Sequence, residues 1–137
     1  MEDTYILDSS VVIEILRGNE EIRDATKRIT EGGEAVITSV TKCEVLVGVK
    51  NNAHRKIVEL IPCVDIGCRT AAIAADLQRE LKKKGLPATL PDTLIAAKAK
   101  ELNATVLTRD RDFERFNVLG IRTVVLDRQS PNAPFTI

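Results

Sequence analysis

The 137-residue sequence is poor in aromatic side chains, histidine and cysteine. It has no tryptophan, one tyrosine, three phenylalanines and a single histidine, His54. So few aromatic rings disfavour the stacking surfaces that hold single-stranded nucleic acid. The single histidine and the absence of a C-x-x-C pair disfavour a structural zinc site. We expect Cys43, Cys63 and Cys68 to be reduced and mostly buried, as suits a cytoplasmic protein.

The sequence also lacks an excess of either charge and a long apolar run. Lys and Arg together number 20, as do Asp and Glu, so no global field indicates a polyanionic partner. No basic segment followed by an apolar run opens the chain, and no apolar stretch reaches membrane-spanning length. We therefore expect a soluble, cytoplasmic protein. Its length fits a single domain over residues 1–137, with an irregular, proline-punctuated tail at about residues 127–137.

Short apolar strands alternate with helical patterns along the whole chain. Strand patterns cover residues 4–7, 35–38, 105–108 and 122–126, and residues 63–66 form either a further strand or an extended link. Helical patterns lie between them, the longest over residues 69–84. Continuously apolar strands are typical of buried parallel sheets. The sequence therefore predicts a three-layer α/β/α domain with a central parallel sheet of four or five short strands.

Four acidic residues stand where strands end or helices begin. Asp8 and Asp110 follow strands, Glu44 lies in the first turns of a helix launched from a strand, and Asp92 opens a helix. Each also has a local explanation: Asp8, Asp92 and Asp110 are acceptable turn or N-cap residues, and Thr41-x-x-Glu44 matches a capping box.

Taken together, the four acids predict a metal site. In a parallel sheet, strand ends and the following helix starts share one edge, so these carboxylates are expected to converge there. Carboxylates that close repel one another unless a cation offsets them, and hard oxygen ligands suit Mg²⁺ or Mn²⁺. Such a site is suited to hydrolysing phosphodiesters.

Four segments give the chain a resemblance to a known family. They are residues 6–13 (ILDSSVVI), 44–48 (EVLVG), 91–97 (PDTLIAA) and 105–113 (TVLTRDRDF). In this order they resemble the PIN-domain ribonucleases, and more narrowly the VapC toxins of toxin–antitoxin pairs. The resemblance spans nearly the whole chain. One departure is Pro91, where relatives often place Asn before the third acid.

The resemblance implies a role for each acid. Asp8, Glu44, Asp92 and Asp110 match the family's catalytic quartet around Mg²⁺ or Mn²⁺, with Asp8 and Asp92 as direct ligands. Glu44 and Asp110 would hold a second ion, bind through water or orient the nucleophile. Asp112 is an alternative to Asp110.

Candidate substrate contacts come from hydroxyl and basic side chains. Ser10 and Thr108 match hydroxyl positions near the family's site, although Ser10 is also a candidate helix cap. Arg109 and Arg111 are candidate phosphate contacts, as are further cations elsewhere in the chain, which are Arg17, Lys82, Lys83, Lys84 and Arg115.

The resemblance implies endonucleolytic cleavage of RNA to 5′-phosphate and 3′-hydroxyl ends. It also implies a homodimer and a small antitoxin that blocks the site with an apolar helix and a basic side chain. A housekeeping PIN nuclease of RNA maturation and a catalytically silent PIN-fold binding module remain as alternatives. A phosphoacceptor domain and a haloacid-dehalogenase-like phosphatase fit poorly, because Ser9 and Ser10 stand where each would need a second acid.

Overall fold

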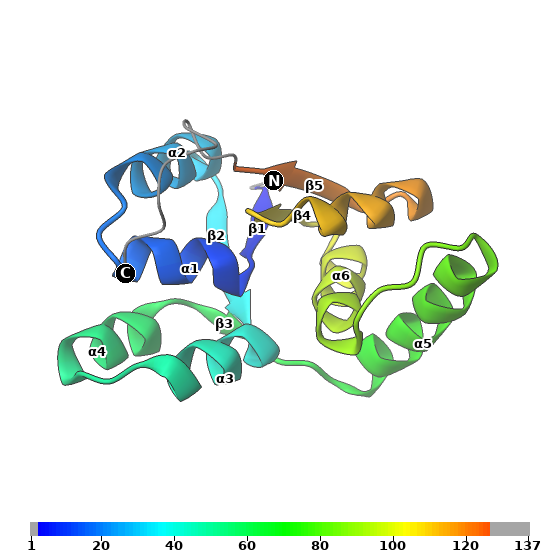
Figure 1. Ribbon diagram of the computed structural model, residues 1–137, viewed down its shortest axis with the longest axis horizontal. Coiled ribbons are helices and arrows are strands. Elements are labelled where there is room, and N and C mark those ends of the chain that lie inside the picture. Colours follow the sequence, from blue (N-terminus) through cyan, green and yellow to red (C-terminus); the bar gives the residue numbers. More distant parts are fainter. Residues whose placement is uncertain (1–2, 127–137) are drawn as a thin grey trace.

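A parallel five-stranded sheet forms the centre of the protein. The computed structural model describes residues 3–126, and within them the strands lie in the order β3-β2-β1-β4-β5 (Figure 1). All neighbouring strands pair in parallel. The strands are β1 (Thr4–Leu7), β2 (Glu34–Thr38), β3 (Cys63–Val64), β4 (Thr105–Thr108) and β5 (Arg122–Val125). The predicted α/β fold with four or five parallel strands is confirmed.

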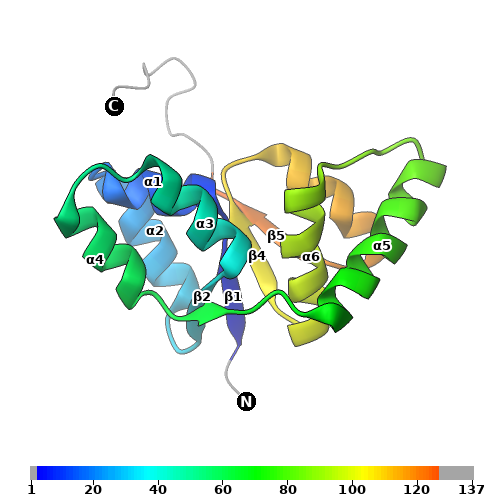
Figure 2. The same ribbon diagram turned by 90° about the horizontal axis from the view of Figure 1, so that it is seen from below.

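Helices cover both faces of this sheet. Figure 2 shows one layer formed by α1 (Ser9–Leu16), α2 (Glu20–Thr30), α3 (Ser39–Gly48) and α4 (Asn52–Leu60). The opposite layer holds α5 (Cys68–Lys83), α6 (Leu90–Leu102) and the 3₁₀ helix η1 (Arg111–Leu119). The predicted three-layer arrangement is thus confirmed.

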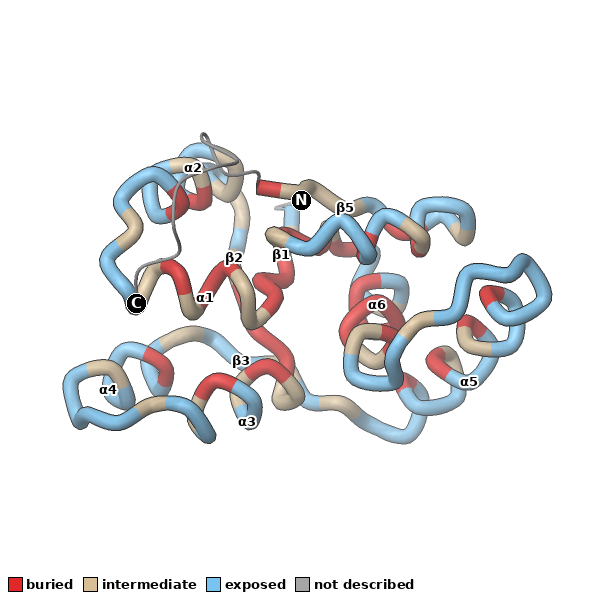
Figure 3. Tube along the Cα trace, viewed as in Figure 1, coloured by how far each residue is buried: buried red, intermediate tan, exposed pale blue. Residues whose placement is uncertain are grey.

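Successive residues of the central strands fill two separate cores. Ile6 and Val106 belong to the cluster under α5, α6 and η1, whereas Leu7 and Leu107 belong to the cluster under α1 to α4. Side chains alternate across a strand, so four apolar residues in a row supply both faces. Figure 3 shows the burial concentrated along the sheet and the helix faces turned toward it.

Three of the predicted helix caps are wrong, because threonine hydroxyls cap α3 and α6 and no side chain caps α1. Thr38 caps α3 by accepting the N–H of Thr41, so the capping box between Thr41 and Glu44 does not form. Thr89 caps α6 by accepting the N–H of Asp92. Ser10 lies inside the first turn of α1, beyond the N-cap position. The acids at 44 and 92 are therefore not explained as caps.

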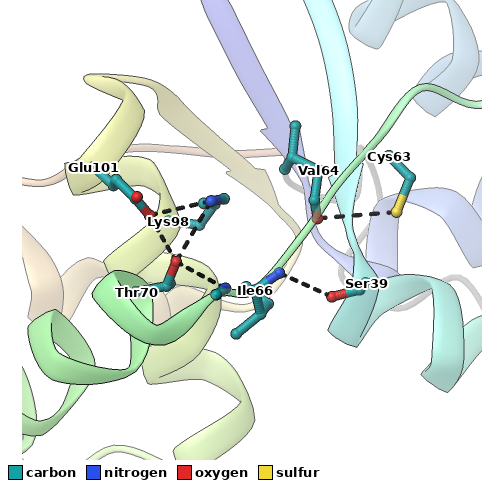
Figure 4. A network of polar contacts seen from close by, with 8 residues as sticks. Ser39, Cys63, Val64, Ile66, Thr70, Lys98 and Glu101 are labelled. Atoms are coloured by element: carbon teal, nitrogen blue, oxygen red, sulfur yellow. Dashed lines mark hydrogen bonds and ion pairs between the residues drawn. The ribbon is translucent and has the colours of Figure 1, made fainter.

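A polar network fixes the link between β3 and α5 at both ends (Figure 4). The N–H of Ile66 donates to Oγ of Ser39 at the start of α3, at 3.2 Å. At the other end, Thr70 donates to Glu101 Oε1 at 2.6 Å, and Nζ of Lys98 donates to the same oxygen at 3.1 Å. These donors lower the pKa of Glu101. The network joins α3 to α5 and α6, and α3 and α6 carry two of the four predicted site acids.

Two further expectations concern features outside the core. All three cysteines are exposed, so their predicted burial is wrong. Cys43 lies within α3, Cys68 is the first residue of α5, and Cys63 begins the edge strand β3. Within residues 3–126 no helix has the length and apolar character needed to cross a bilayer. The predicted irregular tail at 127–137 falls outside the described residues.

Candidate functional site

Asp8 stands where β1 passes into α1 and is 5 % exposed. It occupies the N-cap position of α1, but its side chain accepts no helix N–H. Its Oδ2 instead accepts hydrogen bonds from Oγ of Ser10 at 2.8 Å and Oγ1 of Thr108 at 2.9 Å. The local explanation of Asp8 as a side-chain cap therefore does not hold, and two hydroxyls take the place of helix donors.

The two hydroxyls that hold Asp8 are themselves held by a turn after β4. Oγ of Ser10 accepts the N–H of Arg109 at 3.0 Å, and Oγ1 of Thr108 accepts the N–H of Asp110 at 3.0 Å. The N–H of Asp8 donates to the carbonyl of Leu107 at 2.8 Å, in line with the parallel pairing of β1 and β4. Residues about 100 positions apart thus form one polar cluster at the carboxyl edge of the sheet.

Glu44 and Asp92 bring two further carboxylates to the same edge. Partial burial raises the pKa of Glu44, and the charges of Asp8 and Asp92 raise it further. Partial burial also raises the pKa of Asp92, followed by the charge of Asp8 and, more weakly, that of Asp110. Hydrogen bonding from Thr89 acts in the opposite direction. These pairwise effects connect all four predicted acids, which come from four separate segments of the chain.

Asp110 and Asp112 have different surroundings. Asp110 caps η1 by accepting the N–H of Asp112 at 2.9 Å, while its charge acts on Asp92. The Asp112 carboxylate is 70 % exposed and pairs with Nη2 of Arg115 at 3.3 Å. Of the two candidates for the fourth acid, Asp110 is the one coupled to the other carboxylates.

The side chain of Arg109, a predicted phosphate contact, is buried and held by other groups of the protein. Its Nη1 lies 3.4 Å from Oε2 of Glu14, both side chains are 9 % exposed, and its Nε donates to the carbonyl of Leu126 at 3.3 Å. Glu14 also accepts from Arg17 and Asn19. Sequence reasoning missed Glu14, although an acid among Val11, Val12 and Ile15 in an apolar helix is a signal that could have revealed it.

Arg111 and Arg115 are the two other basic residues between β4 and β5. The guanidinium of Arg111 pairs with Glu114 at 3.5 Å, and its side chain is 66 % exposed. The charge of Arg115 lowers the pKa of Asp92, so this cation lies within electrostatic reach of the acids. Arg115 is therefore better placed beside the site than Arg109.

The donor chemistry of the four acids fits a hard divalent cation. All are carboxylates, and burial together with the charge of neighbouring acids raises the pKa values of Glu44 and Asp92, a penalty that a bound cation relieves. Over residues 3–126, however, no three acidic, histidine or cysteine side chains are already gathered around a common metal position. The carboxylates are coupled by charge, and binding would require them to draw together.

Comparison with known proteins gives consistent matches in sequence and in fold. The family model of the PIN domain matches residues 5–119. Ribonuclease VapC3 of Methanocaldococcus jannaschii is 30 % identical over 92 residues, which cover 67 % of this chain and 94 % of that protein.

Solved structures with this fold include two toxin–antitoxin complexes. A chain of VapBC2 from Rickettsia felis, bound to a promoter DNA fragment, superposes with a TM-score of 0.76 at 19 % identity, covering 90 % of this chain and 99 % of that one. A chain of DNA-bound VapBC from Salmonella typhimurium gives 0.73 at 24 % identity, covering 93 % and 98 %. The acids at the sheet edge, the fold and the sequence match agree: this chain belongs to the PIN-domain family and is similar within it to the VapC proteins.

Proposed function

We propose that the protein is a metal-dependent endoribonuclease of the VapC type. The observation that carries this proposal is the buried Asp8 carboxylate directly after β1, with Asp110 following the neighbouring strand β4. Burial first, and then the charge of Asp8, raise the pKa values of Glu44 and Asp92. Support also comes from the relative VapC3, which is named a ribonuclease.

The four acids would hold Mg²⁺ or Mn²⁺, with Asp8 and Asp92 as the principal ligands. When bound, such an ion supplies an activated water and stabilises negative charge on the phosphate. The chain's own contribution is to hold the Asp8 carboxylate through two hydroxyls and to keep Asp92 at the start of α6. Arg115 provides positive charge beside these acids, and we assign it to the phosphate backbone of the RNA.

We further propose that the protein works as a toxin that a small antitoxin restrains, and that it forms a homodimer. Several solved structures with this fold are toxin–antitoxin complexes, including one from Klebsiella pneumoniae. An antitoxin that covers the site would present a basic side chain, because four carboxylates form a negative site.

Cleavage of a mixed pool of structured RNA tests the proposal. Wild-type protein with Mg²⁺ or Mn²⁺ should give products with 5′-phosphate and 3′-hydroxyl ends, and EDTA should abolish cleavage. Asp8→Asn should reduce the cleavage rate by at least about 100-fold, because changing even the partners of metal ligands reduces activity by about 10- to 100-fold. Asp76→Asn is the matched control, since it removes the same charge from an exposed carboxylate of α5 that pairs with Arg79.

The outcome also separates the alternatives. Equal cleavage by wild type and Asp8→Asn would overturn the nuclease site. Cleavage of one maturation intermediate without growth arrest on expression would favour a housekeeping nuclease. Growth arrest that requires an intact Asp8, and that a co-expressed antitoxin relieves, supports the toxin.

A further inference from the structure

The hydroxyls of Ser10 and Thr108 each link a backbone N–H to the carboxylate of Asp8. Each accepts a hydrogen bond from one N–H of the turn at Arg109 and Asp110, and each donates a hydrogen bond to the same oxygen, Oδ2 of Asp8. We call this arrangement the relay. The four hydrogen bonds measure 2.8 to 3.0 Å, within the range of well-formed bonds. Thr108 is fully buried and Ser10 is partly buried, so water competes little for these bonds.

This arrangement leaves neither hydroxyl with a proton for a substrate. A hydroxyl has a single O–H to donate, and in both residues Asp8 receives it. The oxygens of a phosphate group can only accept hydrogen bonds. While the relay is intact, neither Ser10 nor Thr108 has an O–H left to donate to them. The expectation that these hydroxyls donate to an RNA phosphate therefore conflicts with their hydrogen bonding.

The two carboxylate oxygens of Asp8 differ in their hydrogen bonding. Oδ2 receives both hydroxyls, whereas among the described residues Oδ1 has one longer contact, with Oγ of Ser9 at 3.5 Å. Donation by two hydroxyls that are polarised in turn by backbone N–H groups also strengthens each bond along the chain. Oδ1 is thereby left as the oxygen available to a cation.

The turn that supplies the N–H groups is itself anchored. The side chain of Arg109 is held by Glu14 and by the carbonyl of Leu126, and the side chain of Asp110 caps η1. The two backbone donors therefore start from a fixed position between β4, α1 and the end of β5.

We propose that Ser10 and Thr108 are positioning residues, each of which relays a backbone N–H of the Arg109–Asp110 turn to Oδ2 of Asp8 and so leaves Oδ1 for the metal. This inference rests on the proposed function, because it assigns the metal to Asp8. It differs from that function in predicting that the two hydroxyls control metal affinity and take no part in RNA binding.

Metal binding measured without RNA tests the inference. Calorimetric titration with Mn²⁺ is compared for wild type, Ser10→Ala and Thr108→Val, with Thr108→Ser as the variant that restores the hydroxyl. Each hydroxyl-free variant should bind Mn²⁺ about 10- to 100-fold more weakly, as is typical when a partner of a metal ligand is lost. Thr108→Ser should bind within a few-fold of wild type. Thr26→Val is the matched control, because it removes another buried hydroxyl, one that donates to the carbonyl of Ile22 in α2.

Kinetics at varied Mn²⁺ provide the second measurement. For Ser10→Ala and Thr108→Val, raising Mn²⁺ should recover most of the lost kcat, and the KM for RNA should stay within about twofold of wild type, as expected for loss of an interaction that the substrate does not share. Should Ser10→Ala fail to fold, Ser10→Cys keeps the side-chain size and replaces the hydroxyl by a weak donor.

Each outcome decides between the two proposals. Unchanged Mn²⁺ affinity in both hydroxyl-free variants overturns the relay, and a raised KM for RNA in its place assigns the hydroxyls to the substrate. Failure of wild type itself to bind Mn²⁺ overturns the proposed metal site, and the relay with it. Binding by wild type that weakens in both variants and returns in Thr108→Ser supports the relay.

Discussion

Glu14 and Arg109 form a buried ion pair that joins α1 to the turn after β4. Nη1 of Arg109 lies 3.4 Å from Oε2 of Glu14, and each side chain is 9 % exposed. The same turn donates its backbone N–H groups to the hydroxyls that hold Asp8. The pair thus links the stability of the fold to the geometry of the site.

Removing one member of this pair should destabilise the protein strongly. Arg109→Ala leaves Glu14 buried with fewer donors, and a loss of about 3–5 kcal/mol in the free energy of unfolding is expected from broken buried pairs. Urea unfolding measures this. Arg79→Ala is the control, because Arg79 and Asp76 form a pair whose side chains are 70 % and 69 % exposed. It should change stability by less than about 1 kcal/mol.

A double variant separates the pair from the remaining contacts of Arg109. If Glu14→Leu with Arg109→Leu is no less stable than Arg109→Ala, the charge left behind is the main penalty, as for other buried pairs. A double variant that loses the sum of both single effects would contradict the pairing.

The partial burial of Glu44 and Asp92, together with the charges of the neighbouring acids, predicts an unusual pH dependence for the metal-free protein. Glu44 and Asp92 have pKa values raised above 4.5 and 3.8, so in the window above these values the folded chain binds more protons than the unfolded chain. Stability contributed by these two groups therefore rises as pH falls from neutral through the raised pKa values, and levels off below the ordinary ones.

Asp92→Asn should remove much of this effect. In EDTA at pH 7 the variant should be at least as stable as wild type, and the difference should shrink as the pH is lowered toward 4. Urea midpoints across this range measure it, with Asp76→Asn as an exposed control. A variant clearly less stable than wild type at pH 7 would mean that Asp92 stabilises the start of α6 more than it suffers from its neighbours.

The fourth acid should be Asp110 and not Asp112. Asn is as good an N-cap as Asp, so Asp110→Asn removes the charge and keeps the capping of η1. We expect Asp110→Asn to weaken Mn²⁺ binding and RNA cleavage by about 10-fold or more, the lower bound for partners of a metal site. Its Tm in EDTA should stay near that of wild type.

Asp110→Ala and Asp112→Asn complete this comparison. The alanine variant should also lose about 1 kcal/mol of stability with the cap. Asp112→Asn should leave metal binding unchanged, because its carboxylate pairs with Arg115 on the surface. Equal losses of Mn²⁺ affinity at both positions would show that the site does not distinguish the two acids.

Sequence patterns predicted the strands of the sheet well because each strand can be recognised from a few neighbouring residues. Runs such as residues 105–108 are rich in β-branched and aliphatic side chains, and the alternating Val106 and Leu107 fill the two cores. The caps were predicted poorly because Ser and Thr recur near several helix starts, and a cap one turn earlier fits the pattern equally well. Thr38 and Thr89 are caps that the sequence did not single out.

The convergence of the acids was predictable from topology, whereas the hydrogen bonds that hold Asp8 were not. Strand order brings Asp8 beside the end of β4, as the general rule for parallel sheets requires. The hydrogen bond between Ser10 and the N–H of Arg109 joins residues 99 positions apart in the sequence. It depends on how α1 is rotated relative to the sheet. That rotation is set by packing of the whole layer and leaves no local signature.

Arg115 should contribute to RNA binding more than Arg109 or Arg111 does. Its charge reaches Asp92, and its side chain is 26 % exposed, so a phosphate at the acids can also meet this guanidinium. Arg115→Ala should raise the KM for RNA uniformly across substrates and reduce the slope of log affinity against log salt by about 1, as for loss of one phosphate contact. Because Arg115 lowers the pKa of Asp92, the same variant should raise that pKa further. Activity that needs the ionised Asp92 should then be lost at a higher pH as the pH is lowered. Arg111→Ala is the matched control, since that side chain is 66 % exposed and pairs with Glu114. If Arg111→Ala changes the salt slope and Arg115→Ala does not, the RNA path runs over the outer face of η1 instead of along the side next to Asp92.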